Sequence, residues 1–561
     1  MRRLGTFLIF AALLRDVSAQ VPVPERGPAE RPPLPGFRGA QEPAPRFVLP
    51  PAPSVPDESI RGSLRIVITA FRITGATAFP ESELQALLAP YTKRPIGSQE
   101  LEEARLAITR HYVAAGYINS GAVIPDQDLR GGVVEIRVVE GRLAGIDVEG
   151  DRHFRDAFIR DRVALDAGPP LNVNRLQERM QLLLQNPQVE RINAELAPGV
   201  RPGEARLRMD VKEAPRYTVG AAVANNRSPT VGGTRAEVSF AARDQLGLGD
   251  AFGARIGLSE GLEDETLTFA LPVSARETIV SAKLERVRAQ VVEPPFDLID
   301  IRNRSSAWEV GLSHPFVRTL TTEGTLGATL ARRDNASFLL GQPFAFIPGN
   351  TTGETVVSAL RLIGDWNRRT ADSVLAARLT LSCGLSAMGS TVSTTGDPDS
   401  RFVSRLAQVQ YAHRLPGEAG QVIARFDWQR ANGALLPSEK FAVGGFQSVR
   451  GYRENALVRD FGTVASIEYR RPIGRLALPG AGNGADAGTV EAAVFLDTGR
   501  SRDDGQDATS ISSFGAGLRW TPAPGALALI YKGFPRQSLD TPHRDLQDHG
   551  VHFFLGMQHN F

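Results

Sequence analysis

The C-terminal stretch VHFFLGMQHNF, residues 551–561, alternates between apolar and polar side chains. In an extended strand, successive side chains point to opposite faces. One face then carries Val551, Phe553, Leu555 and Met557, and the other carries His552, Gln558 and Asn560. A strand of about ten residues with one apolar and one polar face is typical of a membrane-spanning β-strand. The stretch therefore predicts a strand that faces lipid on one side and water on the other.

The same alternation recurs upstream, most clearly in residues 421–429 and 490–499. Their apolar faces carry Val422, Ala424, Phe426 and Trp428, and Val490, Ala492, Val494 and Leu496; their polar faces carry Arg425, Asp427 and Gln429, and Glu491, Phe495 and Asp497. From Arg216 onward, turns rich in Gly, Asp, Asn and Pro separate sixteen such stretches, with fourteen or eighteen as alternatives.

An even number of strands suits a closed antiparallel barrel, and sixteen strands would enclose an aqueous lumen. We therefore expect residues 215–561 to form a membrane-spanning antiparallel β-barrel. The alternative is a soluble β-sandwich or propeller. That alternative requires the strand faces to pack against another sheet, and the many charges on the polar faces disfavour it.

The first half of the chain contains an internal repeat with a spacing of 75 residues between Gly75 and Gly150. Each glycine ends a predicted strand. The first unit continues with helices at 82–88 and 98–115 and strands at 122–124 and 133–139; the second continues with helices at 158–165 and 174–184 and strands at 189–196 and 205–211. We expect two tandem α+β domains of β-α-α-β-β order at residues 65–141 and 142–214.

The N-terminus has the pattern of a secretory signal peptide over residues 1–19. Arg2 and Arg3 precede an apolar run at 4–14, and small residues end the segment at Ala19. Residues 20–64 are dense in proline and predict an extended linker. Cys383 is the only cysteine, which excludes an intramolecular disulfide, and we expect it to be a small apolar residue of the barrel wall.

The composition excludes several classes of protein. A net charge of +2 does not favour nucleic acid as a partner. After the N-terminus, no apolar stretch reaches the roughly 20 residues of a membrane-spanning helix, so strands must cross any membrane. The motifs H-E-x-x-H, G-x-S-x-G and G-x-x-x-x-G-K-[ST] are absent, and the eight histidines are scattered. We therefore expect no enzymatic activity, no cofactor and no metal.

Two groups of motifs resemble one known family. YVAAGY at 112–117, IPDQDL at 124–129 and VVEG at 138–141 are similar to the polypeptide-transport-associated (POTRA) domain of two-partner secretion transporters. VGGFQSVRGYRE at 443–454 resembles the inward-folded loop motif of these transporters, and FLDTG at 495–499 resembles their barrel-wall motif. The POTRA signature then falls on Gly116, Tyr117, Pro125, Gln127 and Gly141, and the lumen-loop motif on Val449, Arg450, Gly451 and Tyr452.

The resemblance implies that Arg450 lies inside the barrel and pairs with Asp497. The alternation of residues 490–499 independently places Asp497 on the lumen face, and a guanidinium can hold a carboxylate with two parallel hydrogen bonds. The alternative is an exposed Arg450 without a partner. Phe495 and Gly499 complete the barrel-wall motif. Further expectations are that Phe446 and Tyr452 pack the loop against the wall and that Glu468 and Arg470 are secondary partners.

The resemblance to the two-partner secretion family (TpsB, haemolysin-activator/ShlB type) implies an outer-membrane transporter with its POTRA domains in the periplasm. These domains would capture an unfolded, adhesin- or haemolysin-like exoprotein, expected to be β-helical, by adding it as a strand to a sheet edge. The exoprotein would cross the barrel without nucleotide hydrolysis and fold outside. Two alternatives are an outer-membrane insertion factor, which usually has more POTRA repeats, and a passive porin, which needs no periplasmic arm.

The resemblance also concerns the two ends of the chain. The terminal aromatic Phe561 is similar to the signal that the barrel-assembly machinery reads. The resemblance therefore implies two further partners, this machinery and membrane lipid, and a barrel that acts as a monomer. Many family members begin with a helix that plugs the pore. Here the segment is proline-rich, so either the plug is absent or a short stretch near residues 37–41 replaces it.

Overall fold

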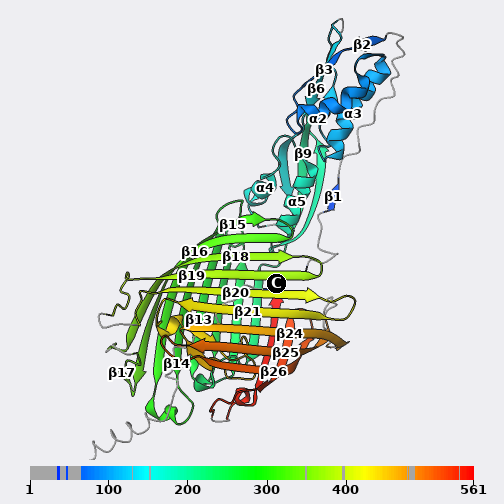
Figure 1. Cartoon of the computed structure of the whole chain (residues 1–561). Coiled ribbons are helices and arrows are strands. Elements are labelled where there is room, and N and C mark those ends of the chain that lie inside the picture. The colour runs from blue at the N-terminus through cyan, green and yellow to red at the C-terminus, as the bar shows by residue number, and fades with distance from the viewer. Residues whose placement is uncertain are drawn as a thin grey trace, which may run out of the picture.

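Two small α+β domains form an arm that leads into a large β-barrel (Figure 1). The computed structural model describes residues 34–37, 46–48, 65–128, 131–150, 153–347, 350, 352–393, 398–476, 478, 487–541 and 544–561. The expected signal peptide at 1–19 lies outside the described residues, as does most of the linker at 20–64.

The first domain packs two helices against a three-stranded sheet of order β3-β6-β5. Its elements are β2 (Ile66–Ile68), β3 (Ala70–Thr74), α2 (Glu81–Leu88), η1 (Ala89–Tyr91), β4 (Arg94–Ile96), α3 (Ser98–Ala114), β5 (Gly121–Val123) and β6 (Val133–Val139). Helix α3 buries one face because Ala104, Ile108 and Tyr112 recur every four residues. Buried and more exposed residues alternate along strand β6, so one face of this strand packs against the helices.

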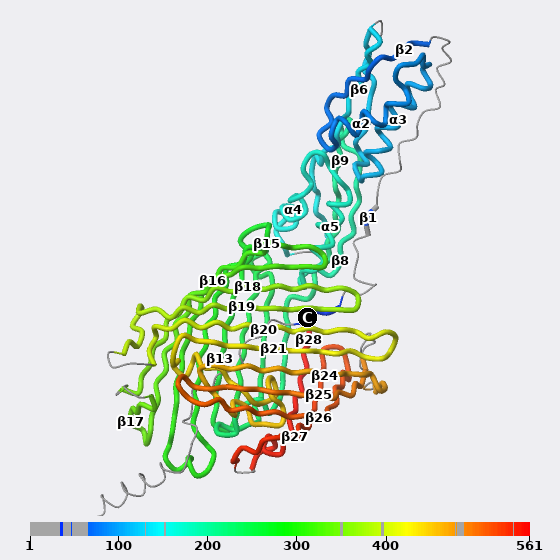
Figure 2. Tube along the Cα trace, in the orientation of Figure 1, coloured from blue at the N-terminus to red at the C-terminus, as the bar shows by residue number. Residues whose placement is uncertain are grey.

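The second domain repeats the order strand, two helices, two strands. Its elements are β7 (Arg142–Glu149), α4 (Asp156–Ala164), α5 (Val173–Leu184), β8 (Val189–Pro198) and β9 (Glu204–Glu213). Helix α5 is capped by Asn172, whose side chain accepts hydrogen bonds from the backbone N–H of Asn174 and Arg175. A short N-terminal strand, β1 (Arg46–Val48), pairs in parallel with β8 and completes a sheet of order β1-β8-β9-β7 (Figure 2).

The repeat extends to single side chains. In each domain a glutamate at the end of the last strand holds the loop between the first helix and the strand that precedes it. Glu140 accepts from Thr77 N at 2.6 Å and Ala78 N at 2.8 Å, and Glu213 accepts from His153 N at 2.6 Å and Phe154 N at 2.9 Å. The glycines that begin these loops, Gly75 and Gly150, have φ values of 77° and 113°, which favour glycine.

Sixteen antiparallel strands close into the barrel, with β10 hydrogen-bonded to β28. They are β10 (Tyr217–Ala224), β11 (Arg235–Arg243), β12 (Ala251–Leu258), β13 (Leu262–Pro272), β14 (Ile279–Gln290), β15 (Arg302–Arg318), β16 (Thr322–Leu339), β18 (Glu354–Arg369), β19 (Ser373–Leu385), β20 (Val403–Arg414), β21 (Gln421–Ala431), β24 (Phe461–Arg475), β25 (Thr489–Arg502), β26 (Thr509–Thr521), β27 (Ala526–Pro535) and β28 (Val551–Asn560). The two-residue β17 (Gln342–Pro343) is an addition to β16. The predicted sixteen-stranded barrel is confirmed, and the sandwich and propeller alternatives are wrong.

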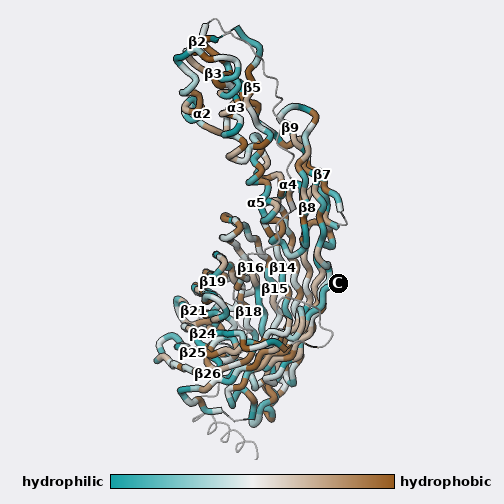
Figure 3. Tube along the Cα trace, turned by 90° about the vertical axis from the view of Figure 1, so that its right-hand side faces the viewer, coloured by the Kyte–Doolittle hydropathy of each residue, from teal (hydrophilic) through white to brown (hydrophobic). Residues whose placement is uncertain are grey.

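The barrel wall has an apolar outer face and a polar, partly covered inner face. On β25, Val494 and Leu496 are 55% and 51% exposed, whereas Phe495 and Asp497, which alternate with them, are 5% and 0% exposed. Figure 3 shows this alternation of hydrophobic and hydrophilic residues along the strands. Cys383 lies half-buried in β19. No helix among the described residues combines the length and the hydropathy that a membrane crossing needs.

The second domain is attached to the turns 244–250 and 273–278 at one end of the barrel. Arg155 N donates to Gly247 O at 2.9 Å, and the Gln188 side chain donates to Gly249 O at 3.1 Å. The guanidinium of Arg162 donates to Glu277 at 2.7 Å. The loops at the other ends of the strands therefore lie on the side of the barrel away from the arm.

Candidate functional site

The loop between β21 and β24, residues 432–460, folds into the barrel and is called here the inward loop. Its stem is a pair of short antiparallel strands, β22 (Phe441–Val443) and β23 (Leu457–Arg459). Val443 and Val449 of the loop are fully buried and pack in one hydrophobic cluster with Val464 of β24 and Ile511 of β26. The predicted lumen-loop motif at 449–452 therefore lies against the inner wall.

Arg450 of the inward loop is paired with Asp497 of β25. The guanidinium donates to both carboxylate oxygens, at 2.8 Å and 2.9 Å, and the backbone N of Arg450 donates at 3.0 Å. The two side chains are 3% and 0% exposed. Ser466 donates to the same carboxylate at 2.7 Å. Because both charges are removed from water, loss of one partner would cost about 3–5 kcal/mol.

Glu468 of β24 is a second carboxylate partner. It accepts a hydrogen bond from Arg450 and another from Arg470 on the same strand. The site thus holds two arginines and two buried carboxylates side by side. Two positive and two negative side chains balance, so the contact between the inward loop and the wall has no net charge.

Aromatic rings surround the Arg450 guanidinium. Its central carbon lies 3.6 Å from the ring centre of Phe495 and 5.0 Å from that of Tyr531. Phe446 of the inward loop packs edge-to-face on Tyr531, with ring centres 5.8 Å apart. Stacking on a ring face stabilises a guanidinium that has lost its water.

The two residues after Arg450 fix the loop to strands β26 and β28 and to the loop 536–550. Gly451 has a φ of 97° and donates its N–H to Nε2 of His552 at 3.2 Å. The Tyr452 hydroxyl lies 3.0 Å from Ser512 O and accepts from Gln537 N at 3.1 Å. His552 is fully buried; the alternation of residues 551–561 predicted its polar face, but no motif marked it as a contact of the loop.

Gly499 leaves the room that the loop occupies. A Cβ atom at this position would lie 2.3 Å from Cγ1 of Val443 and 2.9 Å from Cγ2 of Val449. The barrel-wall motif at 495–499 therefore supplies a ring for Arg450 to stack on, a carboxylate to hold it and a gap for the loop.

A further contact at the root of the inward loop was not predicted. The carboxylate of Glu439 accepts from Arg361 of β18 at 2.7 Å and is 5% exposed. The alternation of β18 places Arg361 on the lumen face, which is the only sequence signal for this pair.

The POTRA signature residues do not form one cluster. Gly116 and Gly141 lie where the two α+β domains meet: Val173 N donates to Gly116 O at 3.0 Å, and Leu171 N donates to Gly141 O at 2.7 Å. Gly116 has a φ of 93°, and at Gly141 a Cβ atom would lie 2.1 Å from Asn119. Gly116 allows the close approach of the two domains, because a Cβ atom there would also lie 2.6 Å from the Asn174 side chain, whereas the space at Gly141 accommodates Asn119 of the first domain itself.

The other three signature residues hold the first domain together. The Gln127 amide exchanges two hydrogen bonds with the backbone of Glu135, at 2.8 Å and 2.7 Å, and also donates to Pro125 O at 3.1 Å. Tyr117 packs edge-to-face on Phe79 in the core, with ring centres 5.7 Å apart. These three residues stabilise the fold of the first domain and do not form a single binding site.

Phe561 lies at the closure of the barrel. Its backbone exchanges hydrogen bonds with Tyr217, the first residue of β10, at 2.9 Å and 3.0 Å, and its ring is 58% exposed. Near the N-terminus, Phe37 lies under the guanidinium of Arg414, at the arm-side end of β20, at 4.5 Å. The rest of the expected plug segment, residues 38–41, is outside the described residues.

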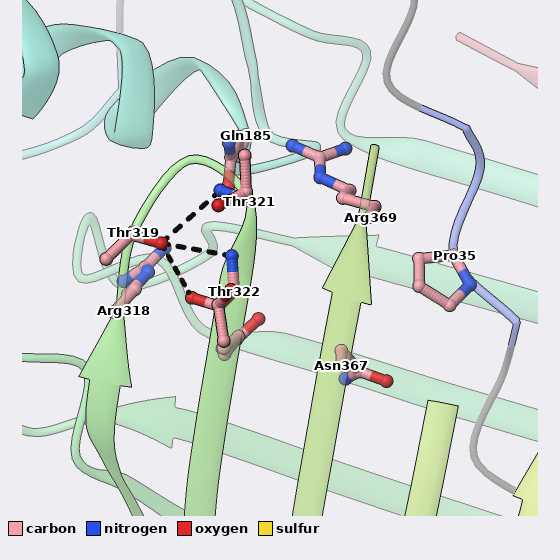
Figure 4. A pocket seen from close by; sticks show the side chains of 9 residues that line it. Pro35, Gln185, Arg318, Thr319, Thr321, Thr322, Asn367 and Arg369 are labelled. Atoms are coloured by element: carbon pink, nitrogen blue, oxygen red, sulfur yellow. Dashed lines mark hydrogen bonds between the residues drawn. The ribbon is translucent and has the colours of Figure 1, made fainter. Parts of the chain in front are cut away.

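Two further observations involve none of the residues that the sequence predicted for a site. A shallow pocket at the joint of arm and barrel is lined by Gln185, Arg318, Thr319, Thr322, Arg369 and Pro35 (Figure 4). Across the residues that the structure describes, no group of three or more His, Cys, Asp or Glu side chains could hold a metal ion.

Comparisons with known proteins agree with this architecture. Residues 66–141 match the model of the POTRA domain, ShlB-type, and residues 203–520 match that of the haemolysin secretion/activation protein ShlB/FhaC/HecB. The chain is 22% identical to the outer membrane transporter CdiB of Dickeya dadantii over 72% of both proteins. It is 20% identical to the heme/hemopexin transporter protein HuxB of Haemophilus influenzae over 69% of both.

Solved structures share the fold. CdiB from Escherichia coli superimposes with a TM-score of 0.66 at 20% identity, over 90% of this chain and 93% of that one. BamA from Haemophilus ducreyi lacking POTRA domains 1–3 superimposes with a TM-score of 0.53 at 14% identity, over 88% of this chain and all of that one.

Proposed function

The chain belongs to the family of haemolysin secretion/activation proteins ShlB/FhaC/HecB, and from this premise we propose how its residues export an exoprotein. It is an outer-membrane transporter with its POTRA domain in the periplasm, and the exoprotein crosses the membrane through its barrel. We propose residues 65–141 and 142–214 as two POTRA domains and residues 215–561 as the pore.

The observation that carries the mechanism is the inward loop, which lies inside the pore and is bound to its wall by Arg450. A loop that moved freely in the lumen would block a passing polypeptide, whereas a loop bound to the wall by a buried ion pair stays out of its path. In our proposal, the Arg450–Asp497 pair keeps the loop at the wall in one defined position while the exoprotein crosses. The stacking on Phe495 and the gap at Gly499 make that position unique.

Capture begins at the arm. Main-chain hydrogen bonds to a free sheet edge can hold an unfolded segment of any sequence. The pairing of β1 with β8 supports such capture, because it is an extended segment added in parallel to a domain edge. The exoprotein would use another edge or displace β1. We propose an adhesin- or haemolysin-like partner rich in β-structure.

Export requires no catalytic step in this scheme. The family is one of transporters, and folding of the exoprotein outside the cell would make the movement unidirectional. We propose that the chain acts as a monomer without enzymatic activity, and that Phe561 is read by the barrel-assembly machinery as β28 enters the membrane.

The test is secretion of the partner exoprotein, sought first in the neighbouring gene, with and without this chain. We expect export only with the chain, and a decrease of at least about tenfold for Arg450→Ala, because a buried carboxylate pair loses its cation. The matched control is Arg459→Ala in the same loop, where the arginine side chain is 37% exposed and pairs with Asp503. Heat-modifiable mobility in gels would show that each barrel is assembled.

Two outcomes would contradict the proposal. Unchanged secretion by an assembled Arg450→Ala barrel would remove Arg450 from the mechanism. Unchanged secretion without the chain, together with failure of other outer-membrane barrels to insert, would instead indicate an insertion factor.

A further inference from the structure

Arg453, three residues after Arg450, joins the inward loop to two loops on the side of the barrel away from the arm. One is loop 291–301 between β14 and β15, and the other is loop 536–550 between β27 and β28. The guanidinium donates to both oxygens of Glu293, at 3.0 Å and 2.8 Å. It also donates twice to Asp548, once at 2.7 Å. These partners are 160 and 95 residues away in sequence.

The three side chains are largely removed from solvent. Arg453 is 13% exposed, Glu293 11% and Asp548 0%. Burial by itself would raise the pKa of Asp548, but the hydrogen bonds from Arg453 and from the backbone N–H of Asp545 and Arg544 keep the pKa below its usual value. A planar guanidinium with five donors suits two carboxylates at once, whereas a lysine ammonium does not.

The neighbouring residues extend the contact to a third loop. Glu454 N donates to the side chain of Gln547 at 2.8 Å, and that side chain donates to the carbonyls of Asn225 and Arg227, at 3.1 Å and 2.7 Å. Asn225 and Arg227 belong to the loop between β10 and β11. The inward loop is thus connected to three loops around the outer mouth of the barrel.

We propose that Arg453, Glu293 and Asp548 form an outer clamp that holds the mouth of the pore closed at rest and opens when an exoprotein leaves. The proposal rests on the proposed export function. The outer clamp is separate from the Arg450 site, because it binds loops rather than the wall. A chain that leaves the lumen on this side must part these loops, and the buried carboxylates give the closed state its stability.

The first test measures leak through the resting pore and needs no exoprotein. In planar bilayers with potassium chloride, Arg453→Ala should raise the open probability at least about tenfold, because it leaves two carboxylates uncompensated. Glu293→Gln and Asp548→Asn should each raise it less, and Arg453→Lys should be intermediate. The matched control is again Arg459→Ala. Control-level leak in assembled Arg453→Ala barrels would overturn the proposal.

The second test asks whether the clamp must open. Arg453→Cys and Asp548→Cys are combined with Cys383→Ser, and a reducible bifunctional thiosulfonate links the two thiols. The linked pore should lose leak and secretion, and reduction should restore both. Secretion through a fully linked pore would refute the opening step. If the unmodified chain does not secrete at all, the export function fails, while the leak measurement still decides the clamp.

Discussion

At the scale of the residue, the site depends on the absence of a side chain as much as on charge. Gly499 faces Val443 and Val449 so closely that even a methyl group would collide with both. The backbone there is an ordinary strand, so the glycine is required for space and not for its backbone conformation. Asp497, two residues earlier on the same face, can reach Arg450 only because the loop comes this near.

We therefore predict that Gly499→Ala displaces the inward loop from the wall. Overpacking of a close contact costs about 1–3 kcal/mol, so the barrel should assemble while the loop loses its fixed position. Leak conductance would report this displacement. The matched control is Gly474→Ala on β24, where no atom lies within 4 Å of the added carbon. Equal behaviour of the two variants would show that the wall can adapt.

At the scale of the element, each arm domain depends on a loop held by one glutamate. Glu140 accepts two backbone hydrogen bonds and two from the hydroxyls of Thr77 and Tyr112. Burial alone would raise the pKa of Glu140, but these hydrogen bonds outweigh it and lower the pKa from the usual 4.5. The ionised form is thus the one that fits the fold.

A pH dependence follows for the first domain. Because the folded state lowers the pKa of Glu140, its contribution to stability is complete above pH 4.5 and is lost as the pH falls further. Glu140→Gln should cost about 1–3 kcal/mol at pH 7 and progressively less as the pH falls below 4.5. Hydrogen exchange of α2 and α3 in the full chain measures this. Glu149→Gln, at an exposed position, is the control, and equal protection at pH 7 in both variants would disprove the role.

At the scale of the whole molecule, a few contacts between the second domain and the barrel turns set the direction of the arm. Arg162 of α4 is its main charged element: it donates to Glu277 and to the carbonyl of Ser274 in one barrel turn, and stacks 3.5 Å from the ring centre of Phe158. The side chain is nearly buried, so its pair with Glu277 is stronger than a surface pair.

Arg162→Ala should loosen the arm relative to the barrel. Loss of a charged hydrogen-bond partner costs about 2 kcal/mol, which is enough to populate other arm orientations. Distances between spin labels on α3 and on the turn 319–321 should broaden. Arg160→Ala, an exposed position on the same helix, should leave them sharp. An unchanged distribution in Arg162→Ala would assign the orientation to the backbone contacts at Gly247 and Gly249.

Local patterns in the sequence were sufficient for the architecture. Alternation with a period of two identified the barrel strands and their lumen faces, including that of Asp497, because each side chain's face depends only on its neighbours in the strand. The repeat of glycine, helices and strands identified the arm, because each domain buries its own core. The sixteen-stranded barrel, the family and its transport function are confirmed. The functional roles of Arg450, Asp497 and the POTRA signature stay predictions.

The sequence by itself thus determined the elements, their faces and the class of transporter, since these depend on short-range periodicity and on contiguous motifs. Only the tertiary structure decided which loops meet. Arg453 and its partners Glu293 and Asp548, and likewise Arg361 and Glu439, lie in segments far apart in the chain, and no local pattern relates them. Closure of the barrel brings these segments together, and burial turns ordinary loop charges into strong, specific contacts.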